Sequence, residues 1–331
     1  MRLYNQHLRW FCKKAKAGFR SLFFGEQANY DFGHAAILME YSNVRNSRKL
    51  RGRYQHGWYI FAEKEFWIND YVPTYVWNHD MLEKAHARGF RNFMAIGSSW
   101  LYFLELLKDR GLYDLATLRK GAVEELWVYG GHSTQTFEAD INRLLSFLER
   151  AKESQSASKV ILLYELDYQK IASHFNVQDF GVTIISIGPR NSSFYSKSHF
   201  FNLFHILTDS QLVITNYPTS LVCYAISLGK DVKWLKDDDF NDACISVDLY
   251  GSESLQQVMR LEIVNASEYK SFAMAELGCD SVKSPNELRE IFFWNGGSRN
   301  MAKVFFFLGR SASYLTLGVL KRPRGLDFKK D

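Results

Sequence analysis

The residues best suited to hold an anion lie between two expected elements in the second half of the chain. Asn216, Thr219 and Ser220 follow the short apolar run Leu212–Thr215 and lead into a helix pattern that begins at Ser220. The first N–H groups of a helix have no partner inside the helix, so a helix start with hydroxyl side chains can bind a phosphate. The alternative is that these hydroxyls only cap the helix.

Two other strand ends carry polar groups of the same kind. Gly188 and Arg190 follow an apolar run, and glycine lets a ligand approach the backbone while a guanidinium can bind a phosphate through two N–H groups. The alternative for Arg190 is a solvated side chain. His132, Ser133 and Thr134 follow a Gly-Gly turn and form a candidate polar pocket. The alternative there is a capped helix start with an incidental histidine.

Candidates for acid–base chemistry stand in the first half of the chain. His56 lies two residues before Trp58, so its imidazole can take a proton from a sugar hydroxyl while the indole stacks on the sugar ring. His79 and Asp80 are a second candidate pair, in which the carboxylate orients the imidazole. The alternative for that pair is structural, because Asn78 or Asp80 also suits the cap of the following helix.

The remaining acidic residues give a weaker signal. Glu165 and Asp167 follow an apolar run, where they bind a ribose or an acceptor hydroxyl or else face water. The acidic run 237–239 is typical of a solvated loop, and no spacing of His, Cys and carboxylates indicates a metal site. The sequence also lacks GxGxxG, GxxxxGK[ST] and GxSxG. We therefore expect neither a metal nor a cofactor.

Strand and helix patterns alternate through the second half of the chain. Short apolar runs separated by helices predict parallel strands joined by right-handed crossovers, a doubly wound sheet. Ligands of such a sheet lie beyond the carboxyl ends of its strands. The expected strands are 126–129, 160–164, 182–187, 212–215 and 232–235, and the expected helices are 137–152, 168–175, 194–208 and 220–228.

The first half alternates less regularly and predicts a second α/β unit. Beyond residue 252 the chain has helix patterns that can pack back across both halves. In the first half the expected strands are 35–39, 58–61, 74–77 and 92–96, and the expected helices are 80–87 and 100–108.

Length and composition exclude several classes of protein. The 331 residues, 47% of them hydrophobic, fit two globular domains rather than one core or a disordered chain. The aromatic share of 16% suits a core but also suits sugar handling. No apolar run reaches the roughly 20 residues that span a bilayer. The four cysteines have no paired spacing, which indicates reduced thiols and a cytoplasmic location.

The net charge of +5 is concentrated at the two ends of the chain. Residues 1–20 contain six basic residues and no acid, interleaved with aromatic side chains, and residues 321–331 contain five basic residues against two acids. Such ends suit peripheral contact with an anionic membrane, such as the inner face of the cell membrane, and the equal alternative is a solvated basic helix. No broad basic face or known motif indicates a nucleic-acid partner.

Several short stretches, in this order, resemble bacterial surface-polysaccharide biosynthesis proteins that look like glycosyltransferases of the GT-B architecture. A subsidiary resemblance is to transferases that use CMP-activated sialic acid or Kdo, which have adjacent hydroxyl residues where Thr219 and Ser220 stand. Many of those also have a His-Pro pair, which this sequence lacks, and His132-Ser133 is the nearest substitute. The stretches are Gln55–Trp58, Val76–Asp80, Leu82–Ala85, Gly89–Phe90, Ala95–Gly97, His132–Thr134, Gly188 with Arg190, Thr215–Asn216, Tyr224–Ala225 and Leu228–Gly229.

The resemblance implies two Rossmann-like lobes with a central cleft, built of parallel sheets flanked by helices. Residues 1–125 would form the acceptor-side lobe, 126–255 the nucleotide-sugar-binding lobe, and 256–331 helices that pack across both. The expected activity is metal-independent transfer of a sugar from a nucleotide-activated donor to a glycan or lipid-linked glycan of a capsule, O-antigen or lipooligosaccharide. Trp58 and Glu165 would contact the acceptor. The alternatives are a nucleotide-sugar-modifying enzyme such as an epimerase, and a non-catalytic assembly protein.

Overall fold

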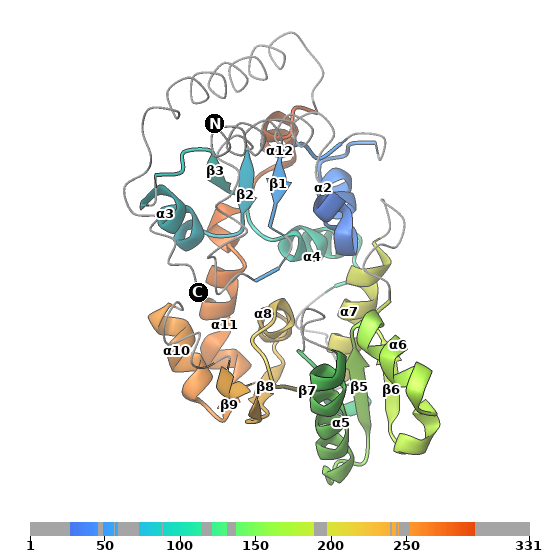
Figure 1. Ribbon diagram of the computed structural model, residues 1–331. Coiled ribbons are helices and arrows are strands. Elements are labelled where there is room, and N and C mark those ends of the chain that lie inside the picture. Colours follow the sequence, from blue (N-terminus) through green and yellow to red (C-terminus); the bar gives the residue numbers. More distant parts are fainter. Residues whose placement is uncertain are drawn as a thin grey trace, which may run out of the picture.

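The protein is an α/β structure with two separate parallel sheets, as the sequence predicts (Figure 1). The computed structural model describes residues 27–45, 49–55, 57–58, 73–87, 89–113, 121–130, 137–188, 197–238, 240–242, 244 and 252–294. Among these residues, no helix is long and apolar enough to cross a membrane.

The first sheet has three parallel strands in the order β1-β2-β3. Strand β2 leads through a helix into β3, which is a parallel β-α-β unit. Because the strands are parallel, their carboxyl ends meet at one edge of the sheet. The elements are η1 (Gln27–Gly33), α2 (His34–Tyr41), β1 (Arg53–Tyr54), β2 (Thr74–Val76), α3 (His79–Ala87), β3 (Phe93–Ala95) and α4 (Ser99–Asp109).

The second sheet has six strands in the order β6-β5-β4-β7-β8-β9, all parallel except the last. The chain builds outward from β4 through β5 to β6, then returns to place β7 and β8 on the other side of β4. Its elements are β4 (Val123–Val128), α5 (Phe137–Glu153), β5 (Lys159–Leu163), α6 (Glu165–His174), η3 (Val177–Phe180), β6 (Thr183–Ser186), α7 (Ser198–Asp209), β7 (Ser210–Thr215), α8 (Ser220–Ser227), β8 (Asp231–Trp234) and β9 (Ile263–Val264).

This strand order creates a topological switch point between β4 and β7. At that point the crossovers leave in opposite directions, and sheets of this topology bind their ligands beyond the carboxyl ends of the two strands. The register pairs Val128 with Thr215, the last residues of β4 and β7. The switch point therefore faces the turn that leads from β7 into α8.

The helices that follow the second sheet return to the first one. They are α10 (Glu253–Arg260), α11 (Ala266–Glu276), η4 (Cys279–Ser281) and α12 (Pro285–Ile291). In Figure 1, α11 runs upward from the level of β9 toward α3, and α12 lies beside β1 and β2. The start of α12 has a capping box between Ser284 and Glu287 with Pro285 in its first turn, a strong local signal for a helix start.

One apolar cluster joins the two sheets. Trp100 on α4 is fully buried, stacks on Tyr224 of α8 with ring centroids 4.4 Å apart, and donates its indole N–H to the Ser227 hydroxyl at 3.0 Å. The cluster includes Trp77 beside the first sheet and Leu126 within the second. Burial of aromatic rings of this size supplies a large part of the apolar area that stabilises the fold.

The strand expected at 35–39 is wrong, because these residues form the middle of α2. His34 and the five apolar residues after it are all buried, so the run has no exposed face from which a helical period could be recognised. The other expected strands and helices that fall on described residues are confirmed within a few residues of their ends. Strands β1 and β9, of two residues each, had no sequence signal. The strand expected at 58–61 falls mostly outside the described residues.

Candidate functional site

Asn216 connects the ends of two strands at the switch point of the second sheet. Its side chain is fully buried; its Oδ1 accepts the Gly130 N–H at 3.0 Å, and its Nδ2 donates to Oδ2 of Asp237 at 3.1 Å. A side chain at Gly130 would place its Cβ 2.2 Å from Cβ of Tyr217, so only glycine fits there. Asn216 thus holds the carboxyl ends of β4 and β7 together.

The start of α8 follows directly from this turn. Thr219 takes the N-cap position with extended backbone, and its side chain makes no capping hydrogen bond. The Ser220 hydroxyl accepts the backbone N–H of Trp58 at 2.8 Å. The two hydroxyls therefore do not cap the helix: that of Ser220 joins α8 to the segment after β1, and that of Thr219 has no such bond.

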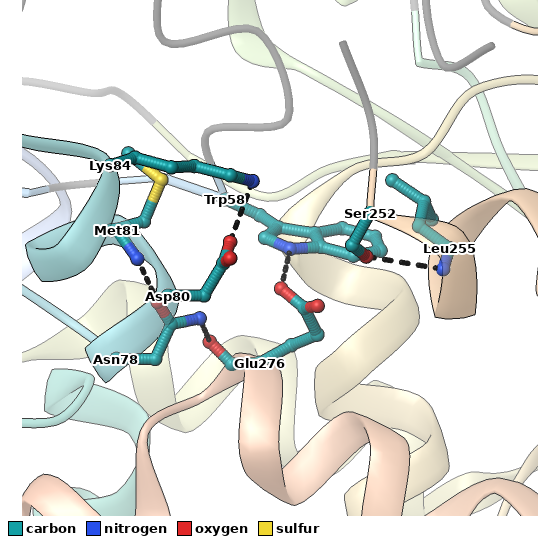
Figure 2. Close-up of polar contacts among 8 residues, drawn as sticks. All are labelled: Trp58, Asn78, Asp80, Met81, Lys84, Ser252, Leu255 and Glu276. Carbon is teal, nitrogen blue, oxygen red and sulfur yellow. Dashed lines mark hydrogen bonds and ion pairs between the residues drawn. The ribbon is translucent and has the colours of Figure 1, made fainter. Parts of the chain in front are cut away.

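Trp58 contacts the second half of the chain through its indole as well. Its Nε1–H donates to Oε2 of Glu276, the last residue of α11, at 2.8 Å (Figure 2). Asn78, at the end of β2, donates from Nδ2 to the backbone oxygen of Glu276 at 3.1 Å, and its Oδ1 accepts the Met81 N–H at 3.0 Å. The carboxyl ends of β1 and β2 therefore meet the ends of α8 and α11.

Glu276 has an unusual environment for a carboxyl group. Burial has the largest effect and raises its pKa above the ordinary value of 4.5. The hydrogen bond from Trp58 and the positive charge of Lys84 lower the pKa, the negative charge of Asp80 raises it, and the net change is an increase. Cys223 on α8 lies close to Glu276. Burial raises the pKa of the Cys223 thiol, and the negative charge of Glu276 raises it further. A carboxylate with a raised pKa is a stronger base than an ordinary one, which suits a group that takes a proton from a substrate.

His79 and Asp80 lie beside this group, in the first turn of α3. Both are exposed, and Asp80 forms an ion pair with Lys84 at 2.7 Å. Asn78, as the structural alternative expects, accepts a hydrogen bond from the first turn of the helix. The acid–base role of His79 and Asp80 stays a prediction.

Glu165 and Gly188 lie at the carboxyl ends of β5 and β6. The Glu165 carboxylate accepts hydrogen bonds from the Ser186 hydroxyl and, at 2.6 Å, from the Gln169 amide. The Gly188 N–H donates to the same Ser186 hydroxyl at 3.0 Å. Asp167 is buried and forms an ion pair with Lys170, so it does not face water. The roles of Glu165 and Gly188 toward a substrate stay predictions.

Five predicted site residues lie outside the described residues: His56, His132, Ser133, Thr134 and Arg190. In the sequence, His56 lies between two described residues just after β1, and residues 132–134 come a few positions after the last residue of β4. In the part of the chain that the structure describes, no three His, Cys, Asp or Glu side chains form a group that could hold a metal ion.

Glu276 is the residue that sequence reasoning missed. It stands in an ordinary helical pattern, with no motif and no histidine nearby in sequence. Its environment comes from Trp58 and α3, roughly two hundred residues earlier in the chain. No local signal could have found it.

No protein-family model matches the chain, and no curated protein matches it in sequence. Among solved structures, it is similar to a UDP-GlcNAc 2-epimerase from Neisseria meningitidis bound to UDP-GlcNAc. The identity is 16% and the TM-score 0.32, over 66% of this chain and 58% of that one. The chain thus spans less than two thirds of the length of that enzyme.

Proposed function

We propose that the protein is a glycosyltransferase that binds a nucleotide-activated sugar beside α8 and transfers the sugar to a glycan hydroxyl. The observation that carries this proposal is the convergence of strand ends from both sheets. Trp58 after β1 and Asn78 after β2 contact the start of α8 and the end of α11. Strand carboxyl ends are where parallel α/β sheets bind ligands, so two such edges that meet suit two substrates.

The proposed donor site lies at the carboxyl edge of the second sheet. A nucleotide at the switch point has the first turn of α8 beside it, where helical N–H groups and the helix dipole stabilise the negative charge of a leaving phosphate. Thr219 contributes a hydroxyl, and Arg190 and the residues 132–134 are further candidate donor ligands. Neither a metal nor a cofactor is part of the proposed reaction.

The proposed acceptor site lies at the carboxyl edge of the first sheet. The indole of Trp58 offers a flat apolar face of the kind on which sugar rings pack, and His56 stands two residues before it. We take the acceptor to be a growing surface glycan, free or linked to a lipid. Basic residues near both ends of the chain would hold the protein near an anionic membrane that carries such an acceptor.

A thermal-shift panel of CMP, UDP, GDP and dTDP tests the donor site. A nucleotide at about 100 times its dissociation constant stabilises the native state by about 2.7 kcal/mol, so one of the four is expected to raise the melting temperature. The Thr219→Val variant removes a hydroxyl that makes no capping bond, so it is expected to keep the melting temperature of the free protein and to lose part of the shift. Ser220→Ala is expected to lose part of the shift as well.

Thr183→Val is the matched control, because it makes the same isosteric change at an exposed position at the start of β6. It is expected to keep the full nucleotide shift. A well-folded protein that gives no shift with any of the four nucleotides would contradict the proposal and favour the non-catalytic assembly role. Conversion of the bound donor into an isomer without release of nucleotide would favour the nucleotide-sugar-modifying enzyme.

A further inference from the structure

Glu276 lies where the proposed donor and acceptor sites meet. Its carboxylate is at the end of α11, against Trp58 of the first sheet and close to the α8 residue Cys223. Figure 2 shows the indole N–H of Trp58 directed at one carboxylate oxygen, with Asn78 and Asp80 on the neighbouring helix start. The residue is partly exposed, although its carboxyl group is largely buried.

Resting on the function proposed above, we propose that Glu276 is the catalytic base that takes the proton from the acceptor hydroxyl. As the acceptor oxygen forms its bond to the anomeric carbon of the donor sugar, its proton passes to the Glu276 carboxylate. The bond between that carbon and the phosphate oxygen breaks, and its electron pair leaves with the nucleotide. No oxidant, reductant or metal enters this balance.

The hydrogen bonds around Glu276 hold one oxygen and leave the other available. Oε2 accepts from Trp58, and the bond from Asn78 to the backbone oxygen fixes the end of the helix. Within the described ranges, Oε1 receives no hydrogen bond. A base must lie within hydrogen-bond reach of the proton that it takes, and an oriented carboxylate with one open oxygen meets that requirement.

The charged groups near Glu276 come from three helices. Asp80 and Lys84 lie on α3, the thiol of Cys223 lies on α8, and Glu276 itself ends α11. Burial has the largest effect on the carboxyl pKa and raises it. The general-base form is the carboxylate, so activity is expected to fall as the pH drops through this raised pKa.

Glu276→Gln is the first test, measured as release of nucleotide from UDP-GlcNAc, GDP-mannose, dTDP-glucose and CMP-sialic acid with water as the acceptor. Glutamine keeps an oxygen that accepts from Trp58 but cannot take a proton. The turnover number is expected to fall about 100- to 10,000-fold, the usual contribution of a positioned base, with the nucleotide thermal shift retained. Glu268→Gln, the same change at an exposed site on α11, is expected to keep the wild-type rate.

The pH profile separates a base from a residue that only supports the fold. Trp58→Phe removes a hydrogen bond that lowers the pKa of Glu276, so the acidic limb of the rate profile is expected to move to higher pH. Asp80→Asn removes a like charge that raises this pKa, so the limb is expected to move to lower pH. If Glu276 only supported the fold, these two substitutions would not move the acidic limb of the rate profile in opposite directions.

The outcomes distinguish this inference from the function on which it rests. If wild-type protein neither binds a nucleotide nor releases one from any of the four donors, the proposed function fails. If wild-type protein does both but Glu276→Gln keeps its turnover within a few-fold, the assignment of Glu276 alone is overturned. Acidic limbs that coincide in wild type, Trp58→Phe and Asp80→Asn would overturn it equally.

Discussion

At the scale of single residues, Trp58 has the greatest influence on the candidate site. Its backbone N–H donates to Ser220 and its indole N–H to Glu276, so one residue contacts two elements that belong to the second half of the chain. Both bonds are partly shielded from solvent, where leaving a donor unpaired costs about 1–3 kcal/mol. The distance between the proposed donor and acceptor sites therefore depends on this one residue.

A second residue at the same place, Gly278, permits a prediction about stability. It adopts φ +74°, and a Cβ there would lie 1.8 Å from the backbone oxygen of Trp77. Gly229 has nearly the same φ, +76°, but open space around it. Gly229→Ala is expected to lower the free energy of unfolding by about 1–2 kcal/mol for the backbone conformation. Gly278→Ala should cost about 1–3 kcal/mol more because the neighbouring strand end must move.

Chemical denaturation of both glycine variants measures this difference directly. Since the left-handed conformation is common to the two positions, the difference isolates the close approach between α11 and the end of β2. Equal losses for Gly278→Ala and Gly229→Ala would show that α11 does not pack against Trp77 as closely as the structure indicates.

Residue type and position in the chain could predict only part of the site. Ser220 and Trp58 are recognisable because one begins a helix after a strand and the other is a tryptophan beside a histidine and a glycine. The bond between them joins residues 162 positions apart, which no local pattern encodes. For Glu276 the relevant property is burial by distant elements, so it becomes visible only once the chain is folded.

At the scale of elements, Glu40 connects three helices. Its carboxylate, on α2, is bonded to Lys197 just before α7 and to Arg110 at the end of α4. Burial raises the pKa of Glu40, but the hydrogen bonds and charges of Lys197 and Arg110 together lower it by more. The folded-state pKa therefore lies below the ordinary value of 4.5. The stabilisation is thus fully present above that value and is lost as the pH falls through the folded-state pKa.

Glu40→Gln is expected to lower the free energy of unfolding by about 1 kcal/mol or less at neutral pH, the range of partly exposed ion pairs. The gap between variant and wild type should close as the pH falls below the lowered folded-state pKa, where the carboxylate is protonated in both states. Urea unfolding at several pH values gives the comparison. A gap that is constant over that range would mean that the ion pairs do not stabilise the helices.

The success of the element predictions follows from the sheet geometry. In the second half, strands covered on both faces are short, continuous apolar runs between helices with exposed faces, so the two periods are distinct. Helix α2 has apolar residues over most of its surface, and its five-residue run is as short as a strand. The order of strands, and hence the switch point, arises from pairing between residues far apart, which the sequence does not display.

At the scale of the whole molecule, the apolar core is shared. Leu38 and Trp100 beside the first sheet belong to the same buried cluster as Leu126 and Tyr224 of the second. Since neither sheet can lose this contact without exposing apolar surface, we expect a single cooperative unfolding transition. Calorimetry would show equal calorimetric and van't Hoff enthalpies. Two resolved transitions would mean that the interface contributes little. The domain boundaries predicted from sequence stay predictions.

The return of α12 to the first sheet affects how the protein is made. The ring of Phe292 packs on Tyr75 of β2 at 4.7 Å, and the Tyr75 hydroxyl donates to the backbone oxygen of Ile291, 216 positions later. A ribosome adding about 5–20 residues per second needs roughly 10–40 s to cover that distance. Once β3 has been made, the first sheet is complete in sequence but lacks its covering helix. The nascent chain therefore keeps apolar surface of the first sheet exposed until α12 has been synthesised, and a chaperone that binds apolar surface would act there.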